Sequence, residues 1–310
     1  MSTTGFGTPA AVSLIGLGAL GILYAHRLEQ KPEVCTLTCI ADKDRQKRYA
    51  QEGIFCNATP CHLTLVDPEE PPSRPADLLI VAVKGTTLDS AIPDCRQHVG
   101  PGTVIISLLN GITSEEHLAR AYPEAHVLHC IAQGMDALRT RHSLVCGHPG
   151  ELILGTDREA LQPDVARVLA LLRSADIPCR EDRDIIHRLY AKWMFNVGIN
   201  QVVAVFEGTY GTIQVDGRPR ELFIAAMREA IEVARACGIA LTEQDLQEYI
   251  ALAGTLAPES MPSMRQDALA HRKTEVELFA GTVLARAREL GLATPVNAWL
   301  YEKLQALEHR

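Results

Sequence analysis

The sequence has no Cys-x-x-Cys pair, no excess of basic residues and no apolar run long enough to cross a bilayer comfortably. Its nine cysteines are scattered without a recognisable zinc-site spacing, which is typical of reduced thiols in a cytoplasmic protein, and no metal is expected. The net charge is -8, which argues against a nucleic-acid partner.

One apolar stretch, AAVSLIGLGALGILYA at residues 10–25, has the look of a signal peptide. No Lys or Arg precedes it, however, and it contains three glycines. It is also short for a membrane span. We interpret it as a buried strand that runs into a helix, and we expect neither a membrane partner nor a membrane location.

The length of 310 residues predicts about two domains, and a 47% hydrophobic composition allows a sizeable core. Up to about residue 183, short apolar runs alternate with helical stretches, as in an α/β fold. Strands are predicted at 11–15, 37–41, 78–83, 104–108, 127–132, 143–146, 152–154 and 177–179, and helices at 19–29 and 161–172. This pattern predicts a Rossmann-type domain over 1–183 with a mixed-sheet tail.

From residue 184 to 310 helical periodicity dominates, and the sequence predicts an all-helical substrate or dimerisation domain. Pro219 can open a helix that runs to residue 237, with Gly238 as its C-cap. Thr242 is typical of an N-cap, Gly291 of a helix end, and Thr294 followed by proline of a last helix start.

A glycine motif directly follows the first predicted strand and opens the first helix. Gly16 allows a tight turn, Gly18 lets the backbone approach a pyrophosphate, and Gly21 permits close helix packing. The free N–H groups of the helix start favour an anion. The predicted cofactor-binding residues of this loop are Gly16, Leu17, Gly18, Ala19, Leu20 and Gly21.

The second strand ends in IADKDRQKR, about 20 residues beyond the glycines. An acid at this point usually binds the ribose hydroxyls, so Asp42 favours NAD. Arg45 could instead bind a 2′-phosphate, or it could belong to a solvated helix face. The residues alone leave the choice of cofactor open.

Two polar residues follow the next strands of the predicted sheet. Lys84 comes after LLIVAV and Asn110 after VIISLL. In open α/β sheets ligands bind beyond the carboxyl ends of the strands. We therefore expect both residues near the cofactor, although a solvated Lys84 is the plainer alternative.

A third polar feature lies in the apolar stretch LYAKWMFNVGIN at residues 189–200. Lys192, Asn196 and Asn200 are spaced four apart, which on a helix gives one gently drifting polar stripe. Buried amides need partners, and a buried ammonium needs an anion. The stripe is either a satisfied core network or a set of donors facing a ligand, in which Lys192 could deliver a proton.

Two later segments add Ser263 and Glu275. A single helix over 263–275 would hold these side chains about 18 Å apart along its axis, too far for one small substrate. Either Ser263 lies in a bent entry turn or Glu275 has another function, such as pairing with Arg272 on an exposed face.

Taken in order, GLGALG, AVKGTT, SLLNGI, AKWMFNVGIN, SMPSMRQD and TEVE make the sequence similar to the ketopantoate reductase family over nearly its whole length. The resemblance implies a Rossmann domain, an all-helical domain and an active site in the cleft between them. It also implies hydride transfer from NADPH to C2 of a 2-oxo acid, most simply 2-dehydropantoate, with NADH not excluded.

The resemblance further implies residue roles. Lys192 and Glu275 are the expected catalytic residues, with Lys192 as general acid and Glu275 in support of it. Lys84 and Asn110 lie near cofactor and keto group, and Asn196, Asn200 and Ser263 bind substrate. Tyr210 stands near a position where family members often carry another Asn, and neither its role nor that of Asp267 follows from the motifs.

Three functions therefore compete. They are a 2-dehydropantoate reductase, a related dehydrogenase for another small oxo or hydroxy acid, and a nucleotide-binding sensor without catalysis. A homodimer is compatible with the apolar helical half, which could equally be ordinary core.

Overall fold

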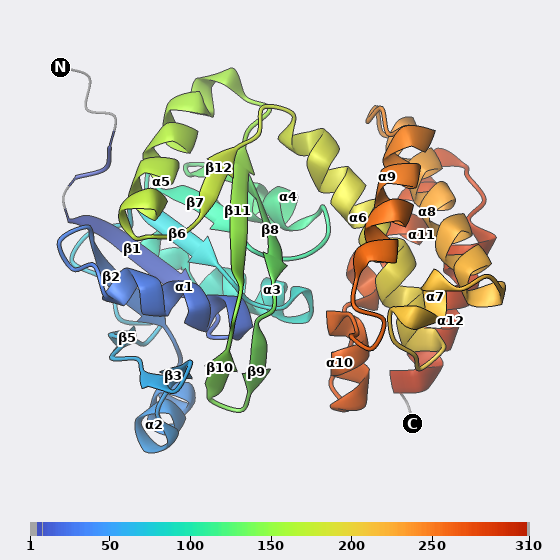
Figure 1. Ribbon diagram of the computed structural model, residues 1–310. Helices are drawn as coiled ribbons and strands as arrows, with labels where there is room; N and C mark the ends of the chain where they lie inside the picture. The colour runs from blue at the N-terminus through green and yellow to red at the C-terminus, as the bar shows by residue number, and fades with distance from the viewer. Residues whose placement is uncertain (1–4, 8, 309–310) are drawn as a thin grey trace. The chain divides into compact units, whose positions relative to one another are not determined.

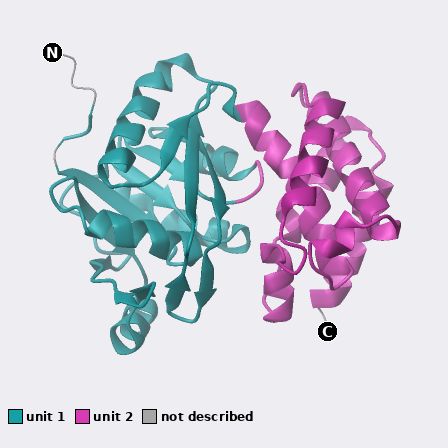
Figure 2. Ribbon diagram, in the orientation of Figure 1, with its two compact units in different colours: residues 1–109, 113–185 teal, residues 110–112, 186–310 magenta. Residues whose placement is uncertain are grey.

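The computed structural model describes residues 5–7 and 9–308 and divides the chain into two compact units (Figure 2). Unit 1 comprises residues 1–109 and 113–185, and unit 2 comprises residues 110–112 and 186–310. The short segment Asn110–Ile112 thus belongs to the helical unit although it lies within the α/β half of the sequence.

Unit 1 is an α/β unit (Figure 1). Its strands are β1 (Ala10–Ile15), β2 (Cys35–Ile40), β3 (Phe55–Cys56), β4 (Thr59–Pro60), β5 (Leu65–Val66), β6 (Leu78–Val81), β7 (Val104–Ser107), β8 (His126–Met135), β9 (Leu138–Thr140), β10 (Ser143–Val145), β11 (Pro149–Gly155) and β12 (Cys179–Glu181). Its helices are α1 (Ala19–Glu29), α2 (Lys43–Glu52), α3 (Leu88–Asp94), α4 (Ser114–Ala121) and α5 (Gln162–Ser174), with 3-10 turns at Gly85–Thr87, Arg96–His98 and Glu159–Leu161.

The main sheet has the strand order β12-β11-β8-β7-β6-β1-β2-β5. The neighbouring strands β8, β7, β6, β1, β2 and β5 all run parallel to one another. Strand β11 is antiparallel to β8 and parallel to β12. The chain passes from β1 to β2 on one side, and β6 pairs on the other side of β1, so the strand order reverses at β1. Such a reversal opens a crevice at the carboxyl ends of the strands.

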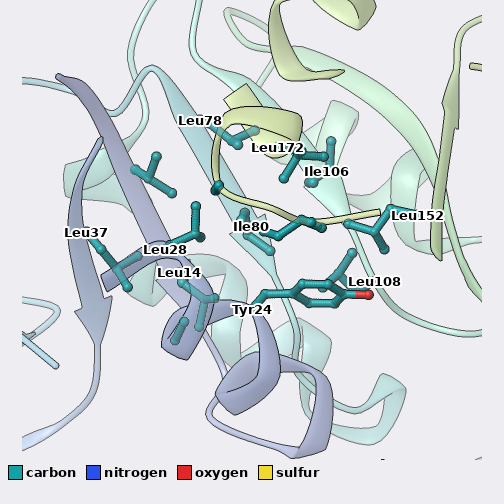
Figure 3. Close-up of a cluster of buried hydrophobic side chains, with 14 of the residues drawn as sticks. Leu14, Tyr24, Leu28, Leu37, Leu78, Ile80, Ile106, Leu108, Leu152 and Leu172 are labelled. Atoms are coloured by element: carbon teal, nitrogen blue, oxygen red, sulfur yellow. The ribbon is translucent and has the colours of Figure 1, made fainter. Parts of the chain in front are cut away.

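Side chains of the central strands alternate between two buried clusters, one on each face of the sheet. Leu14 and Ile80 pack in a cluster with α1 and α5 (Figure 3). Ile15 and Val81 pack in the other, with α3 and α4. This period-2 alternation explains why the strands are apolar on both faces, since helices cover both.

A smaller sheet has the order β4-β3-β10-β9. Its strands are two or three residues long. They are too short to show a clear period, so only β10 corresponds to a predicted strand.

Unit 2 consists of helices (Figures 1 and 2). They are α6 (Ile185–Val205), which starts at the unit boundary, α7 (Gly211–Gln214), α8 (Arg218–Ala236), α9 (Glu243–Thr255), α10 (Ser263–Leu269), α11 (Ala280–Leu290) and α12 (Pro295–Glu308), with a 3-10 turn at Val276–Leu278. Trp193, Phe223 and Phe279 are among its fully buried side chains. In the part of the chain that the structure covers, no helix is both long and apolar enough to pass through a membrane.

The predicted fold class is confirmed in both halves, including the mixed tail of the sheet. The strand predicted at 177–179 is wrong by two residues. Asp176 has a φ of 54°, and the Ile177 N–H bonds to the Leu172 carbonyl, so Ile177 still belongs to the turn that ends α5. The strand begins only at Cys179.

Candidate functional site

The glycine loop joins β1 to α1 at the point where the strand order reverses. Gly16 has a φ of +95°, and a Cβ there would lie 2.7 Å from the Ala82 carbonyl carbon at the end of β6. At Gly21 an added Cβ would lie 1.8 Å from the Gly16 carbonyl oxygen. Both positions need glycine for the fold alone, because any side chain would meet backbone.

Gly18 differs from its neighbours. A Cβ added there would meet only the Ala82 carbonyl oxygen, at 3.8 Å, so packing within the protein does not require glycine. Gly18 is the N-cap of α1, where no side chain caps the helix and the first turn carries no acid. Free space at Gly18, before a helix start without a side-chain cap, fits a pyrophosphate, which would accept hydrogen bonds from the N–H groups of the first turn.

The end of β2 carries the predicted ribose-binding residues. Asp42 is the N-cap of α2, and its Oδ1 accepts the Arg45 N–H at 2.7 Å. The Arg45 guanidinium lies 3.4 Å from Asp42 Oδ2, and both side chains are about half exposed. The acid and the base predicted for alternative cofactors are therefore paired with each other.

Two further carboxylates belong to this region, and no sequence motif singled them out. The pKa of the Asp94 carboxyl is raised overall, chiefly by burial. The positive charge of Arg45 lowers it in part, and the negative charges of Asp42 and Asp67 raise it further. Asp67 follows β5 and is buried. Arg45 therefore interacts with both Asp42 and Asp94, which weakens the attraction of this guanidinium for another anion.

Lys84 follows β6 as predicted. It precedes the 3-10 turn Gly85–Thr87, its carbonyl accepts the Thr87 N–H at 2.9 Å, and the residue is exposed.

In unit 2, the polar stripe of 192, 196 and 200 lies on one helix, α6. Lys192 and Asn196 are half-buried, whereas Asn200 is only 4% exposed. The stripe therefore runs from a solvent-accessible end into the core.

Asn110 connects two of the predicted catalytic residues. Lys192 Nζ donates to Asn110 Oδ1 at 3.4 Å, and Asn110 Nδ2 donates to Glu275 Oε2 at 3.4 Å. Lysine can only donate and an ionised carboxylate can only accept, so this pairing fixes the orientation of the amide. The structure brings together an ammonium, an amide and a carboxylate from three distant parts of the sequence.

Trp193 holds the segment that carries Glu275. Its indole Nε1 donates to the Leu278 carbonyl at 2.9 Å, and a Cβ on Gly111 would lie 3.3 Å from Leu278 Cβ. Sequence reasoning treated Trp193 only as an apolar residue. A buried indole needs an acceptor, and that requirement was the available signal.

The segment 263–275 is not one helix, so the estimated 18 Å separation does not apply. Helix α10 ends at Leu269, and His271 has a φ of 49°. Arg272 Nε donates to Asp267 at 2.9 Å across the turn after α10. Ser263 is exposed at the first position of α10, and Glu275 is half-buried.

Tyr210 lies at the N-cap of α7, and its N–H bonds to the Ser260 carbonyl at 2.8 Å. Burial raises the pKa of its phenol.

A cavity of about 370 Å³ in unit 1 is lined by none of the predicted site residues and is bordered by His26, Cys56 and Cys146 among others.

Comparisons with known proteins give the same result for both halves of the chain. The family model described as "Ketopantoate reductase PanE/ApbA" matches residues 12–157, and the one described as "Ketopantoate reductase PanE/ApbA C terminal" matches residues 184–308. A 2-dehydropantoate 2-reductase of Aquifex aeolicus is 25% identical over 301 residues, which cover 95% of this chain and 96% of the relative.

Two solved structures show the same fold. A ketopantoate reductase from Staphylococcus aureus, described as dimeric, has a TM-score of 0.78 at 23% identity and covers 96% of this chain and 99% of its own. A D-mandelate dehydrogenase with NADH and anilino(oxo)acetate has a TM-score of 0.84 at 21% identity, with 96% and 98% covered.

Proposed function

The chain belongs to the ketopantoate reductase family, and we propose that it reduces 2-dehydropantoate to (R)-pantoate with a reduced nicotinamide dinucleotide. The observation that carries this proposal is the contact of Lys192, Asn110 and Glu275 in unit 2. The open, uncapped glycine loop of unit 1 supports the dinucleotide.

When bound, a reduced dinucleotide would supply a hydride to C2 of the oxo acid. The carbonyl oxygen would then need a proton, and we assign its delivery to Lys192. An ammonium has three protons, so Asn110 Oδ1 can orient one while another is given to substrate. The same positive charge stabilises the negative charge that develops on the oxygen.

Glu275 acts through Asn110 in this proposal. By accepting from Asn110 Nδ2, it keeps the amide oxygen directed at Lys192. It is therefore a positioning residue, whereas sequence reasoning placed it among the catalytic ones. Asn196 and Asn200 are proposed to bind the carboxylate or hydroxyls of the substrate, with Asn200 at the buried end. The exposed Ser263 and Lys84 keep their proposed roles toward substrate and cofactor.

The test is the loss of NADPH absorbance in the presence of 2-dehydropantoate. We expect turnover by the wild type and a fall in kcat of about 10²–10⁴-fold for Lys192→Ala. Lys273→Ala, an exposed lysine near Glu275, is the matched control and should keep wild-type activity. No turnover by the wild type, or unchanged turnover in Lys192→Ala, contradicts the proposal.

For the cofactor we propose NADPH with only a weak preference over NADH. The 2′-phosphate of NADPH would form an ion pair with Arg45, but it would compete with Asp42 for that guanidinium. It would also be repelled by the negative charges of Asp94 and of Asp67 beside it. Arg45→Ala should lower kcat/KM for NADPH and leave NADH nearly unchanged, and Asp42→Ala should do the reverse. A strong preference for NADPH that survives Arg45→Ala would contradict this assignment.

A second candidate is a dehydrogenase for a different 2-oxo or 2-hydroxy acid. Asp42 favours it, because an acid at this strand end is typical of NAD-linked enzymes. A panel of branched aliphatic and aromatic 2-oxo acids, assayed with both cofactors, separates the two candidates by kcat/KM. Tight NADPH binding without turnover of any of them would indicate a sensor.

We also propose a homodimer, as described for the related Staphylococcus aureus enzyme. Sedimentation velocity at micromolar concentration should give about twice the chain mass of 33.9 kDa. A monomer under these conditions would contradict it.

A further inference from the structure

Three side chains with metal-binding atoms meet at the C-terminal end of α1, outside the proposed active site. His26 and Glu29 are one turn apart on α1, and Cys61 follows β4. His26 Nδ1 lies 3.0 Å from Glu29 Oε1 and 3.4 Å from Cys61 Sγ. All three ligating atoms lie within 4.8 Å of one another.

Two of these separations are close to those between neighbouring ligands of a tetrahedral zinc site. With Zn–N and Zn–O near 2.0–2.1 Å and Zn–S near 2.3 Å, neighbouring ligand atoms are about 3.3–3.6 Å apart. The separations of His26 Nδ1 from Glu29 Oε1 and from Cys61 Sγ differ from those values by a few tenths of an ångström. Imidazole, thiolate and carboxylate are also the three ligand types that Zn²⁺ takes in proteins.

The surroundings hold two of these groups in place. Glu29 Oε2 accepts the backbone N–H of His62 at 2.7 Å, which leaves Oε1 directed at His26. Gln30 Nε2 lies 3.0 Å from His26 Nε2. Zinc binding through Nδ1 requires the proton on Nε2, and the Gln30 amide, turned by 180° so that its oxygen faces Nε2, would accept the hydrogen bond from that N–H.

Access and burial also fit a bound ion. The His26 and Glu29 side chains are 14% and 13% exposed, so the groups are partly desolvated but reachable. His26 borders the cavity of about 370 Å³. A metal ion binds the thiolate form of cysteine, so binding here would release the Cys61 proton.

We propose that His26, Glu29 and Cys61 bind one Zn²⁺, with water as the fourth ligand. The ion joins the end of α1 to the segment after β4 and thereby stabilises unit 1. The site does not depend on the proposed oxidoreductase activity, because none of its residues belongs to that site.

The experiment uses the full-length protein, freed of metal with a chelator and then titrated with Co²⁺ and Zn²⁺. We expect one Co²⁺ per chain, a thiolate-to-cobalt charge-transfer band, and competition by Zn²⁺. Zn²⁺ should raise the melting temperature of the wild type. Cys61→Ser should abolish the band, and Gln30→Ala should weaken binding by about 10-fold or more, as loss of an outer-shell partner does.

Matched controls separate this site from the other thiols. Cys179→Ser, another half-buried cysteine of unit 1, should keep the band and the affinity. His26→Ala should lose tight binding while its melting temperature in chelator stays close to that of the wild type. Absence of the band in the wild type, its persistence in Cys61→Ser, or its loss in Cys56→Ser instead, would each overturn the proposal.

Discussion

Gly18 and Gly21 lie three residues apart in one glycine motif, Gly18 before α1 and Gly21 within it, yet an added methyl group meets different surroundings at each. At Gly18 the nearest atom would be 3.8 Å away, and at Gly21 it would be 1.8 Å away. Gly18→Ala should therefore leave the free energy of unfolding nearly unchanged and weaken NADPH binding. Gly21→Ala should lower the unfolding free energy itself, by about 1–3 kcal/mol.

Urea denaturation and NADPH titration of both variants provide the measurements. Equal loss of stability in the two variants would contradict the reading of Gly18 as a ligand-imposed glycine.

Glu275 offers a residue-scale test of positioning. The carboxylate accepts one hydrogen bond from Asn110 Nδ2, and a glutamine oxygen can accept the same bond. Glu275→Ala should lower kcat about tenfold, which corresponds to a rise of roughly 1.4 kcal/mol in the activation free energy. Glu275→Gln should have a kcat between those of Glu275→Ala and the wild type. NADPH affinity should not change in either variant. If the glutamine variant is no better than alanine, the negative charge itself is required.

At the scale of single residues, the sequence predicted those functional residues whose neighbours in space are also neighbours in the chain. It did not predict contacts between residues that are far apart in the chain. The glycine motif is read within six residues, because strand, turn and helix follow each other directly. The contact of Asn110 with Glu275 spans 165 positions, and no spacing rule reaches that far. The interaction of Asp94 with Arg45, and that of Asp67 with Asp94, were missed for the same reason.

At the scale of elements, α6 packs against α8 through a glycine. A Cβ on Gly198 would lie 2.7 Å from Met227 Cγ and 2.9 Å from the Phe223 carbonyl oxygen. Gly198→Ala should lower the unfolding free energy by about 1–3 kcal/mol through overpacking, although alanine is the better helix former.

Gly254 in α9 is the matched control, because a Cβ there meets nothing within 4 Å. Gly254→Ala should raise the unfolding free energy by up to about 1 kcal/mol. Chemical denaturation of both variants should give opposite signs, and the same sign in both would contradict the packing argument.

The start of α9 carries a pH-dependent contribution to stability. Burial raises the pKa of Asp245, but hydrogen bonds from Thr242 and His187 outweigh it, and the pKa is lowered overall. A lowered pKa means that the contribution is fully present above the unfolded value near 3.9 and is lost as pH falls through the folded value.

Asp245→Asn should therefore lower the unfolding free energy by about 1 kcal/mol at pH 5.5, the usual worth of a capping interaction. The difference from wild type should shrink as pH falls below about 4. Denaturation midpoints measured between pH 5.5 and 3 test this, and a difference that grows on acidification would contradict the assignment.

Element boundaries were predicted well where a side chain determines them. Thr242 caps α9 in a capping box, and Gly291 ends α11 at a φ of 69°. The strand at 177–179 was misplaced because Ile177 is apolar and buried in either conformation. The single helix considered over 263–275 does not form, because α10 ends at Leu269 and His271 has a left-handed φ of 49°, which no glycine in the sequence signals.

On the scale of the whole molecule, the two units carry different parts of the proposed chemistry. Unit 1 has the glycine loop and its own buried clusters, and unit 2 has Lys192 with a separate set of buried aromatic residues. Composition and periodicity predicted an α/β half and a helical half. They could not predict that Asn110–Ile112 belongs to unit 2, because the segment follows a strand of unit 1 in sequence.

Separate cores predict separate responses to heat. A ligand at about 100 times its dissociation constant stabilises the part that binds it by about 2.7 kcal/mol. In calorimetry NADPH should raise one transition, and Gly18→Ala should remove that shift. Gly198→Ala should lower the other transition and leave the NADPH shift intact, because its close contacts all lie within unit 2. A single transition that responds equally to NADPH and to Gly198→Ala would show that the units unfold as one and would contradict this division.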